Sequence, residues 1–164
     1  LKPAANIVVN FASREPMLRH PGIVTFGKTR RLCNMANLTA TCPELAPPGW
    51  HLYVAYAVPK PALGDFDNEG EIALALDDLR ELFPGFDEAA RILSIRVMRD
   101  DWPAQRSCAG YDLPRDTGVP GLWCVGDAVK VYGNGGTQAC AETAKLVVDE
   151  ILAGCRRADP PPAG

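Results

Sequence analysis

The 164-residue chain lacks the features that mark several large classes of protein. No apolar run comes near the roughly 20 residues that a transmembrane helix needs. The formal net charge is only −3, and the sequence has no basic surface typical of a nucleic-acid-binding protein. We therefore predict no membrane-spanning segment and no nucleic-acid partner, and leave peripheral membrane contact open. The one dense cationic cluster, at residues 28–31, indicates a solvated loop rather than a phosphate site.

Cysteine and histidine are too scattered along the sequence for a zinc site. The six cysteines contain no CxxC pair, and there are only two histidines. The spacing does not indicate a disulfide scaffold either, so we expect a cytoplasmic location. No signal peptide opens the chain, and it begins at Leu1 rather than Met. We therefore expect a segment processed or excised from a longer protein.

The first two thirds of the chain have the pattern of a sheet with one helix. The predicted strands are short β-branched or aromatic runs punctuated by proline and glycine: 7–11, 23–26, 31–41, 51–58 and 92–98. Apolar residues at helical spacing, from Ile72 to Phe83, predict a helix that stops at Pro84-Gly85. The pattern indicates a mostly antiparallel sheet with one crossing helix.

The last third has the pattern of a strand, a glycine turn and a helix. Residues 122–125 predict a short strand in a buried, parallel position. Glycines at 133, 135 and 136 follow, and a helix is expected from Thr137 to a stop at Gly154. Its expected apolar face is Cys140, Ala144, Val147, Val148 and Ile151.

This arrangement is suited to holding a cofactor. Asp127 follows the predicted strand, where a carboxylate can accept hydrogen bonds from a sugar or ribitol hydroxyl, although a turn-forming Asp fits equally well. Gly135 and Gly136 allow close approach of a ligand, and the N–H groups of Thr137 and Gln138 would face it. An ordinary loop is the alternative. The dinucleotide fingerprint GxGxxG is absent from the sequence.

Three segments together resemble a known family. Residues 120–127 with the glycine turn are similar to the C-terminal flavin motif of FAD-dependent oxidoreductases. Residues 46–52 and 82–85 resemble two further motifs of the phytoene desaturase-like group, within the amine oxidase superfamily. The resemblance implies FAD as cofactor, and it implies that Asp127 binds the ribitol while the helix N-terminus faces the flavin ring. The expected cofactor-binding residues are Gly126, Asp127, Gly135, Gly136, Thr137 and Gln138.

The resemblance also predicts the fold and what this chain does not contain. We expect an α+β fold: a substrate-domain portion at 1–106, the C-terminal strand–turn–helix of a Rossmann-like FAD-binding domain at 107–154, and a disordered tail at 155–164. The family's N-terminal βαβ unit, which holds the ADP half of FAD, is missing. A partner chain or the rest of the protein must therefore supply it.

Two functions fit these observations. The first is the C-terminal part of an FAD-dependent oxidoreductase that desaturates, isomerises or oxidises its substrate by hydride transfer. The substrate would be an apolar small molecule such as an isoprenoid, and this part is expected to be inactive alone. The alternative is a non-catalytic binding or assembly subunit that completes a partner's flavin site. No catalytic residue and no metal ligand is predicted, because hydride transfer to a flavin requires neither a nucleophile nor paired carboxylates.

Overall fold

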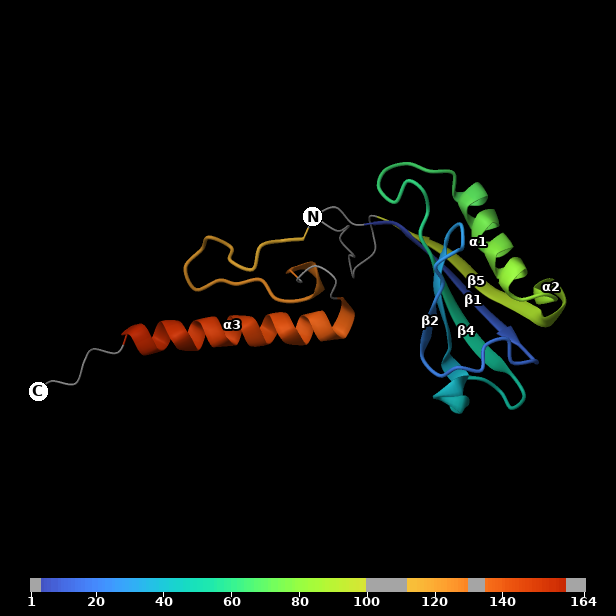
Figure 1. Cartoon of the computed structure of the whole chain (residues 1–164), viewed down its shortest axis with the longest axis horizontal. Helices are drawn as coiled ribbons and strands as arrows, with labels where there is room; N and C mark the ends of the chain where they lie inside the picture. Colours follow the sequence, from blue (N-terminus) through green and yellow to red (C-terminus); the bar gives the residue numbers. More distant parts are fainter. Residues whose placement is uncertain (1–3, 100–111, 130–134, 159–164) are drawn as a thin grey trace, which may run out of the picture. The chain divides into compact units, whose positions relative to one another are not determined.

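The chain folds into two compact units (Figure 1). The structure is a computed structural model that describes residues 4–99, 112–129 and 135–158. One unit contains residues 4–103, and the other contains residues 104–164 together with residues 1–3. Each unit is described by itself.

The first unit is built on a five-stranded antiparallel sheet with the strand order β2-β3-β4-β1-β5. The strands are β1 (Asn6–Ser13), β2 (Ile23–Thr25), β3 (Leu32–Asn37), β4 (His51–Ala57) and β5 (Ala90–Met98). The predicted antiparallel sheet is confirmed. The strand expected within residues 31–41 ends earlier, at Asn37, because two short 3-10 helices follow, η1 (Leu38–Ala40) and η2 (Pro43–Leu45).

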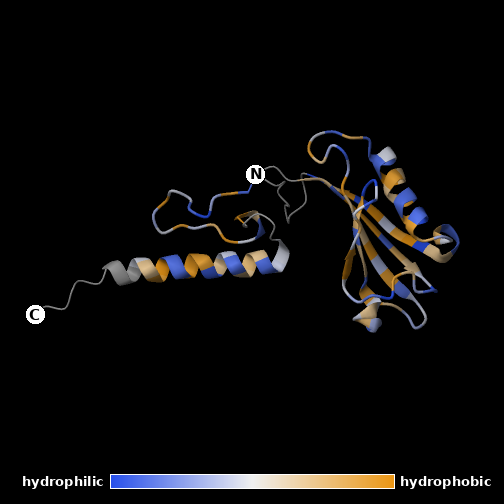
Figure 2. Cartoon of the chain, in the orientation of Figure 1, coloured by the Kyte–Doolittle hydropathy of each residue, from blue (hydrophilic) through white to orange (hydrophobic). Residues whose placement is uncertain are grey.

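One long helix and one short helix accompany the sheet. The predicted helix is α1 (Asn68–Leu82), which begins where the Asp67 side chain accepts a hydrogen bond from the N–H of Glu69 at 3.1 Å. Apolar and hydrophilic residues alternate along α1 (Figure 2), as expected for a helix with one face against a sheet. After Pro84, Gly85 adopts a φ of +83°, which favours glycine, and α2 (Phe86–Ala89) begins.

The hydrophobic core lies between α1 and one face of the sheet. Alternate residues of β1 and β4 point into it, as the two-residue period of a strand requires. The buried cluster consists of Ile7, Val9, Phe11, Leu32, Met35, Tyr53, Ala55, Ala57, Ala75, Leu79 and Phe86. At its centre Phe11 stacks on Tyr53 at 4.8 Å, and Phe86 meets Phe11 edge-on at 5.2 Å. The Tyr53 hydroxyl accepts a hydrogen bond from the N–H of Met17 at 2.9 Å, so this buried polar atom is satisfied.

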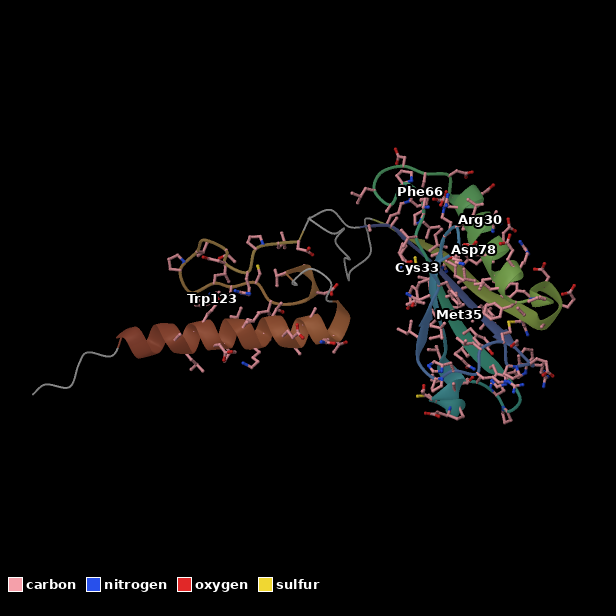
Figure 3. All side chains as sticks on the ribbon, viewed as in Figure 1. Arg30, Cys33, Met35, Phe66, Asp78 and Trp123 are labelled. Carbon is pink, nitrogen blue, oxygen red and sulfur yellow. The ribbon has the colours of Figure 1, made fainter. Side chains whose placement is uncertain are left out.

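A buried carboxylate of α1 organises the turn between β2 and β3 (Figure 3). Asp78 is 2% exposed and accepts hydrogen bonds from the backbone N–H groups of Arg30, Arg31 and Leu32 at 2.9, 2.7 and 2.9 Å. The Arg30 guanidinium adds a further contact to Asp78 at 3.1 Å. Arg31 pairs with Glu71, which is also buried. Both arginines of the 28–31 cluster therefore bind carboxylates of α1.

These two carboxyl groups should make the unit sensitive to acid. Burial alone would raise the pKa of Asp78, but the N–H donors and Arg30 outweigh it and lower the pKa below 3.8. The hydrogen bond from Arg31 lowers the pKa of Glu71 below 4.5. A lowered pKa stabilises the fold fully above the ordinary value of about 4, and this contribution disappears as the pH falls toward the folded-state pKa. Urea unfolding across this range should show a free energy of unfolding that decreases as the pH is lowered. This decrease should be less steep in Asp78→Asn. Equal slopes would contradict this prediction.

The described part of the second unit consists of an irregular segment, residues 112–129, and one long helix. The segment holds an isolated antiparallel bridge between Asp116 and Trp123 and ends in the 3-10 helix η3 (Asp127–Val129). The helix is α3 (Gly136–Ala158). Gly154 lies inside α3, so the predicted stop there is wrong, and the predicted tail begins with helical residues. Residues 159–164 lie outside the described residues.

The strand predicted at residues 122–125 is also wrong. Trp123 makes only the isolated bridge, and Leu122 and Val125 are 54% and 55% exposed. A parallel strand needs hydrogen-bonded neighbours on the same sheet. The described residues of this unit contain no such neighbours, so these apolar residues remain at the surface.

The predicted apolar face of α3 is right in part. Val147 is buried and Ala144 and Ile151 are half-buried, whereas Cys140 is exposed and Val148 is 52% exposed. The fully buried positions are Ala139, Thr143 and Val147, which share one side at intervals of four residues.

Candidate functional site

The predicted cofactor residues gather where η3 meets the first turn of α3. Asp127 is half-buried at the start of η3, and its Oδ1 accepts a hydrogen bond from the N–H of Gly136 at 2.6 Å. The carboxylate therefore stands at the N-terminus of α3, where the helix dipole favours negative charge. A carboxylate in this position is an acceptor for N–H and hydroxyl donors.

Gly126 holds the turn before Asp127 in place. Its φ is +118°, a conformation that side-chain-bearing residues rarely adopt. Its N–H donates to Thr143 Oγ1 at 2.9 Å, and that hydroxyl donates to the carbonyl of Ala139 at 2.8 Å. Thr143 is 2% exposed. The turn is thus fixed to α3 one and a half to two turns from the helix N-terminus.

Three of the predicted residues, Gly136, Thr137 and Gln138, form the start of α3, and Gly135 directly precedes it. Gly136 has a φ of +63°, and a Cβ there would meet no described atom within 4 Å. Glycine is therefore required at this position by its backbone conformation rather than by crowding. Gly135, Thr137 and Gln138 are exposed, and the Gln138 side chain donates to Glu142 at 2.9 Å. Because the first-turn N–H groups have no acceptor within the helix, those of Thr137 and Gln138 are available to an acceptor outside it. Gly133 lies outside the described residues.

Thr143 and Arg115 are parts of this unit that the sequence reasoning missed. Arg115 pairs with Glu150 of α3 at 2.6 Å, and its carbonyl accepts from the N–H of Cys124 at 2.9 Å. The available signal for Thr143 was its place on one line with Ala139 and Val147. A threonine between two apolar residues at that spacing predicts a buried hydroxyl with a local partner.

Comparison with known proteins gives this arrangement a class. Residues 5–152 match the family model described as flavin containing amine oxidoreductase. The chain is 31% identical over 139 residues to the uncharacterized protein MJ1488 of Methanocaldococcus jannaschii, a match that covers 84% of this chain and 33% of that protein. It is similar to the crystal structure of an oxidoreductase from Methanosarcina mazei, with 33% identity and a TM-score of 0.74 over 91% of this chain and 35% of that one.

The chain is therefore of the flavin oxidoreductase type. It belongs to the flavin containing amine oxidoreductase family, because the family model spans most of its length. It covers about a third of the length of both relatives. Membership in this family implies a flavin cofactor, which agrees with the superfamily resemblance seen in the sequence. Among the described residues, no helix is long and apolar enough to cross a membrane.

The residues around Asp127 fit one part of a flavin cofactor. A flavin nucleotide carries a polyhydroxylated ribitol and a ring that becomes electron-rich on reduction. Asp127 is an acceptor for a hydroxyl, and the N-terminus of α3 supplies N–H donors beside it. The open space at Gly126 and Gly136 would admit a ligand close to the backbone. The contacts of the six predicted residues with a flavin stay a prediction.

Proposed function

We propose that this chain is the C-terminal part of an FAD-dependent oxidoreductase of the phytoene desaturase-like group. In this proposal it completes the flavin site of a longer polypeptide, or of a partner chain that holds the ADP half of FAD. The observation that carries the proposal is the contact between the Asp127 carboxylate and the first residue of α3. It joins a hydroxyl acceptor and a set of backbone donors in one small site.

Each side of this site has its own role in the proposal. The flavin supplies hydride chemistry when bound, exchanging a hydride with a substrate carbon. Asp127 would accept the ribitol hydroxyls and so fix the position of the cofactor along α3. The N–H groups of Thr137 and Gln138 would stabilise negative charge at the pyrimidine end of the ring. Gly135 and Gly136 would keep side chains away from the cofactor.

The sheet of the first unit is proposed to supply a wall of the substrate site. The face opposite α1 carries every second residue of β1 and β4, among them Val8, Ala12, Leu52 and Val54, which are buried or half-buried. Polar groups lie on the same face: the Asn10 side chain donates to Ser94 Oγ at 3.0 Å, and Tyr56 and Arg96 are the cross-strand partners of Val8. The apolar part of this face would contact an apolar substrate, such as an isoprenoid.

Reconstitution tests the proposed flavin site. The purified 164-residue chain should be colourless by itself. When it is co-purified with a chain that carries the ADP-binding part, the complex should show the visible absorption of bound flavin. Asp127→Ala should reduce the retained flavin about tenfold or more, because a hydrogen bond to a charged group contributes about 1.5–3 kcal/mol. Asp149→Ala removes an exposed carboxylate elsewhere on α3 and should leave flavin retention unchanged.

Two results decide between the catalytic and the non-catalytic function. Full flavin retention by Asp127→Ala would overturn the proposal. Asp127→Asn keeps an oxygen that can accept the N–H of Gly136 but removes the negative charge, so it separates these two roles of the carboxylate. Circular dichroism reports whether α3 has kept its helix content. A yellow complex whose flavin is never reduced by apolar substrates, isoprenoids included, would instead support a non-catalytic assembly subunit.

A further inference from the structure

A pocket on the first unit is lined by none of the residues of the proposed flavin site. It has a volume of about 270 Å³ and lies where β1 ends and β4 and β5 begin. Apolar side chains dominate its lining, with Leu45, Pro47 and Trp50 from the segment before β4 and Leu52 from β4 itself. The pocket therefore joins the apolar sheet face described above to the loop that follows η2.

An irregularity in β5 adds one wall of this pocket. The pairing of β1 and β5 shifts between Asn10 and Phe11, and Leu93 is the extra residue on β5. Such a bulge redirects a side chain. Leu93 lines the pocket and is 52% exposed, and Leu45 on the other side is 53% exposed. Two large apolar side chains thus face solvent around a concave, apolar surface, and a ligand bound there would remove both from water.

The charge at this pocket is positive. Arg91 lines it and is the only charged residue among the described lining residues. A second guanidinium lies beside it, because Arg14 stacks over the ring of Trp50 at 4.4 Å. Cations at the edge of an apolar cavity complement a ligand with an apolar body and an anionic end.

We propose that this pocket binds the end of a hydrocarbon chain whose terminal group is an anion held by Arg91. The volume is below the roughly 300–1,000 Å³ typical of sites that enclose a whole ligand, so it suits one end of a longer molecule. The proposed ligand has one hydrocarbon chain and a terminal carboxylate or phosphate, a chemistry that a substrate and a free lipid would share. The proposal needs no flavin and none of the residues beyond 103, so its failure leaves the proposed flavin site untouched.

Equilibrium dialysis of the 164-residue chain against three probes tests this proposal. The probes are decanoate, decanol and decyltrimethylammonium, each below its micellar concentration. Decanoate should bind best and decyltrimethylammonium worst, because Arg91 attracts only an anion. Arg91→Gln should weaken decanoate binding about tenfold, as expected for loss of a charged hydrogen bond, and leave decanol binding unchanged. The double variant Leu45→Ser, Leu93→Ser should weaken the binding of all three probes.

Matched controls make the result decisive. Both leucines are half exposed, so their replacement should preserve the fold, which circular dichroism checks. Ile23→Ser removes a more exposed apolar residue from the opposite edge strand β2 and should leave the binding of all three probes unchanged. Equal binding of the three probes, or decanoate binding that survives both Arg91→Gln and the double variant, would overturn the proposal. Co-sedimentation with phosphatidylglycerol vesicles tests the membrane alternative, and binding confined to the vesicles would also overturn the proposal. Finally, a decanoate affinity of Ile23→Ser as low as that of the double variant would show that the pocket is not the site.

Discussion

Replacing Asp78 by alanine should lower the free energy of unfolding of the first unit by about 3–5 kcal/mol. The substitution removes the acceptor for three consecutive backbone N–H groups, and that of Leu32 is buried. It also leaves Arg30 without its contact to Asp78. Buried N–H donors that lose their acceptor are neither hydrated nor hydrogen-bonded, and this lowers the free energy of unfolding strongly. Urea unfolding, followed by circular dichroism, measures the change.

Two further variants test whether the N–H groups carry this effect. Asp78→Asn keeps one acceptor oxygen and loses the other, so it should cost clearly less than Asp78→Ala. Asp77→Ala is the control, because it removes the neighbouring exposed carboxylate, whose described partner is the exposed Arg80. It should change the free energy of unfolding by no more than about 0.5 kcal/mol. If the three variants were equally stable, Asp78 would not hold the turn between β2 and β3.

Replacing Tyr53 by alanine should cost a similar amount, about 3–5 kcal/mol. The ring is completely buried and stacks on Phe11, which in turn meets Phe86. Its removal leaves a cavity on the core face of β1 and β4 that the rigid, close-packed neighbours cannot close. Urea unfolding monitored at several wavelengths gives the loss and shows whether the transition stays cooperative.

The conservative variant Tyr53→Phe separates the ring from its hydroxyl. Phenylalanine keeps the stacking and loses only the hydrogen bond with the N–H of Met17, so the expected loss is about 1 kcal/mol. A loss as large as that of Tyr53→Ala would mean that the hydroxyl, and not ring packing, stabilises this part of the core.

The sheet could be predicted because each of its strands carries its own signal. β4 alternates buried and half-buried residues along its length, and α1 has apolar residues at helical spacing with a capping Asp67. Local patterns of this kind depend only on neighbours in sequence. The role of Asp78 could not be predicted in this way, because its partners lie more than 40 residues away in the chain.

The second unit shows the opposite case. An apolar run such as 122–125 predicts a strand only if other strands flank it, and the described residues of this unit supply none. The glycine turn and the start of α3 were predictable, since Gly136 has a left-handed φ and Asp127 accepts its N–H. The hydroxyl of Thr143 was missed because its partner Gly126 is distant in sequence.

The pairing of β1 with β5 places the two ends of the first unit beside each other. Asn6 is opposite Met98, and Cα atoms of paired antiparallel residues are about 4.5–5.5 Å apart. The backbone thus enters and leaves this unit at one point, and the sheet, both helices and the apolar pocket lie between. A segment with adjoining ends can be exchanged as a cassette between relatives, since its host needs to accommodate only a single junction. The sheet face and the pocket can therefore change in sequence without any change in the residues around Asp127.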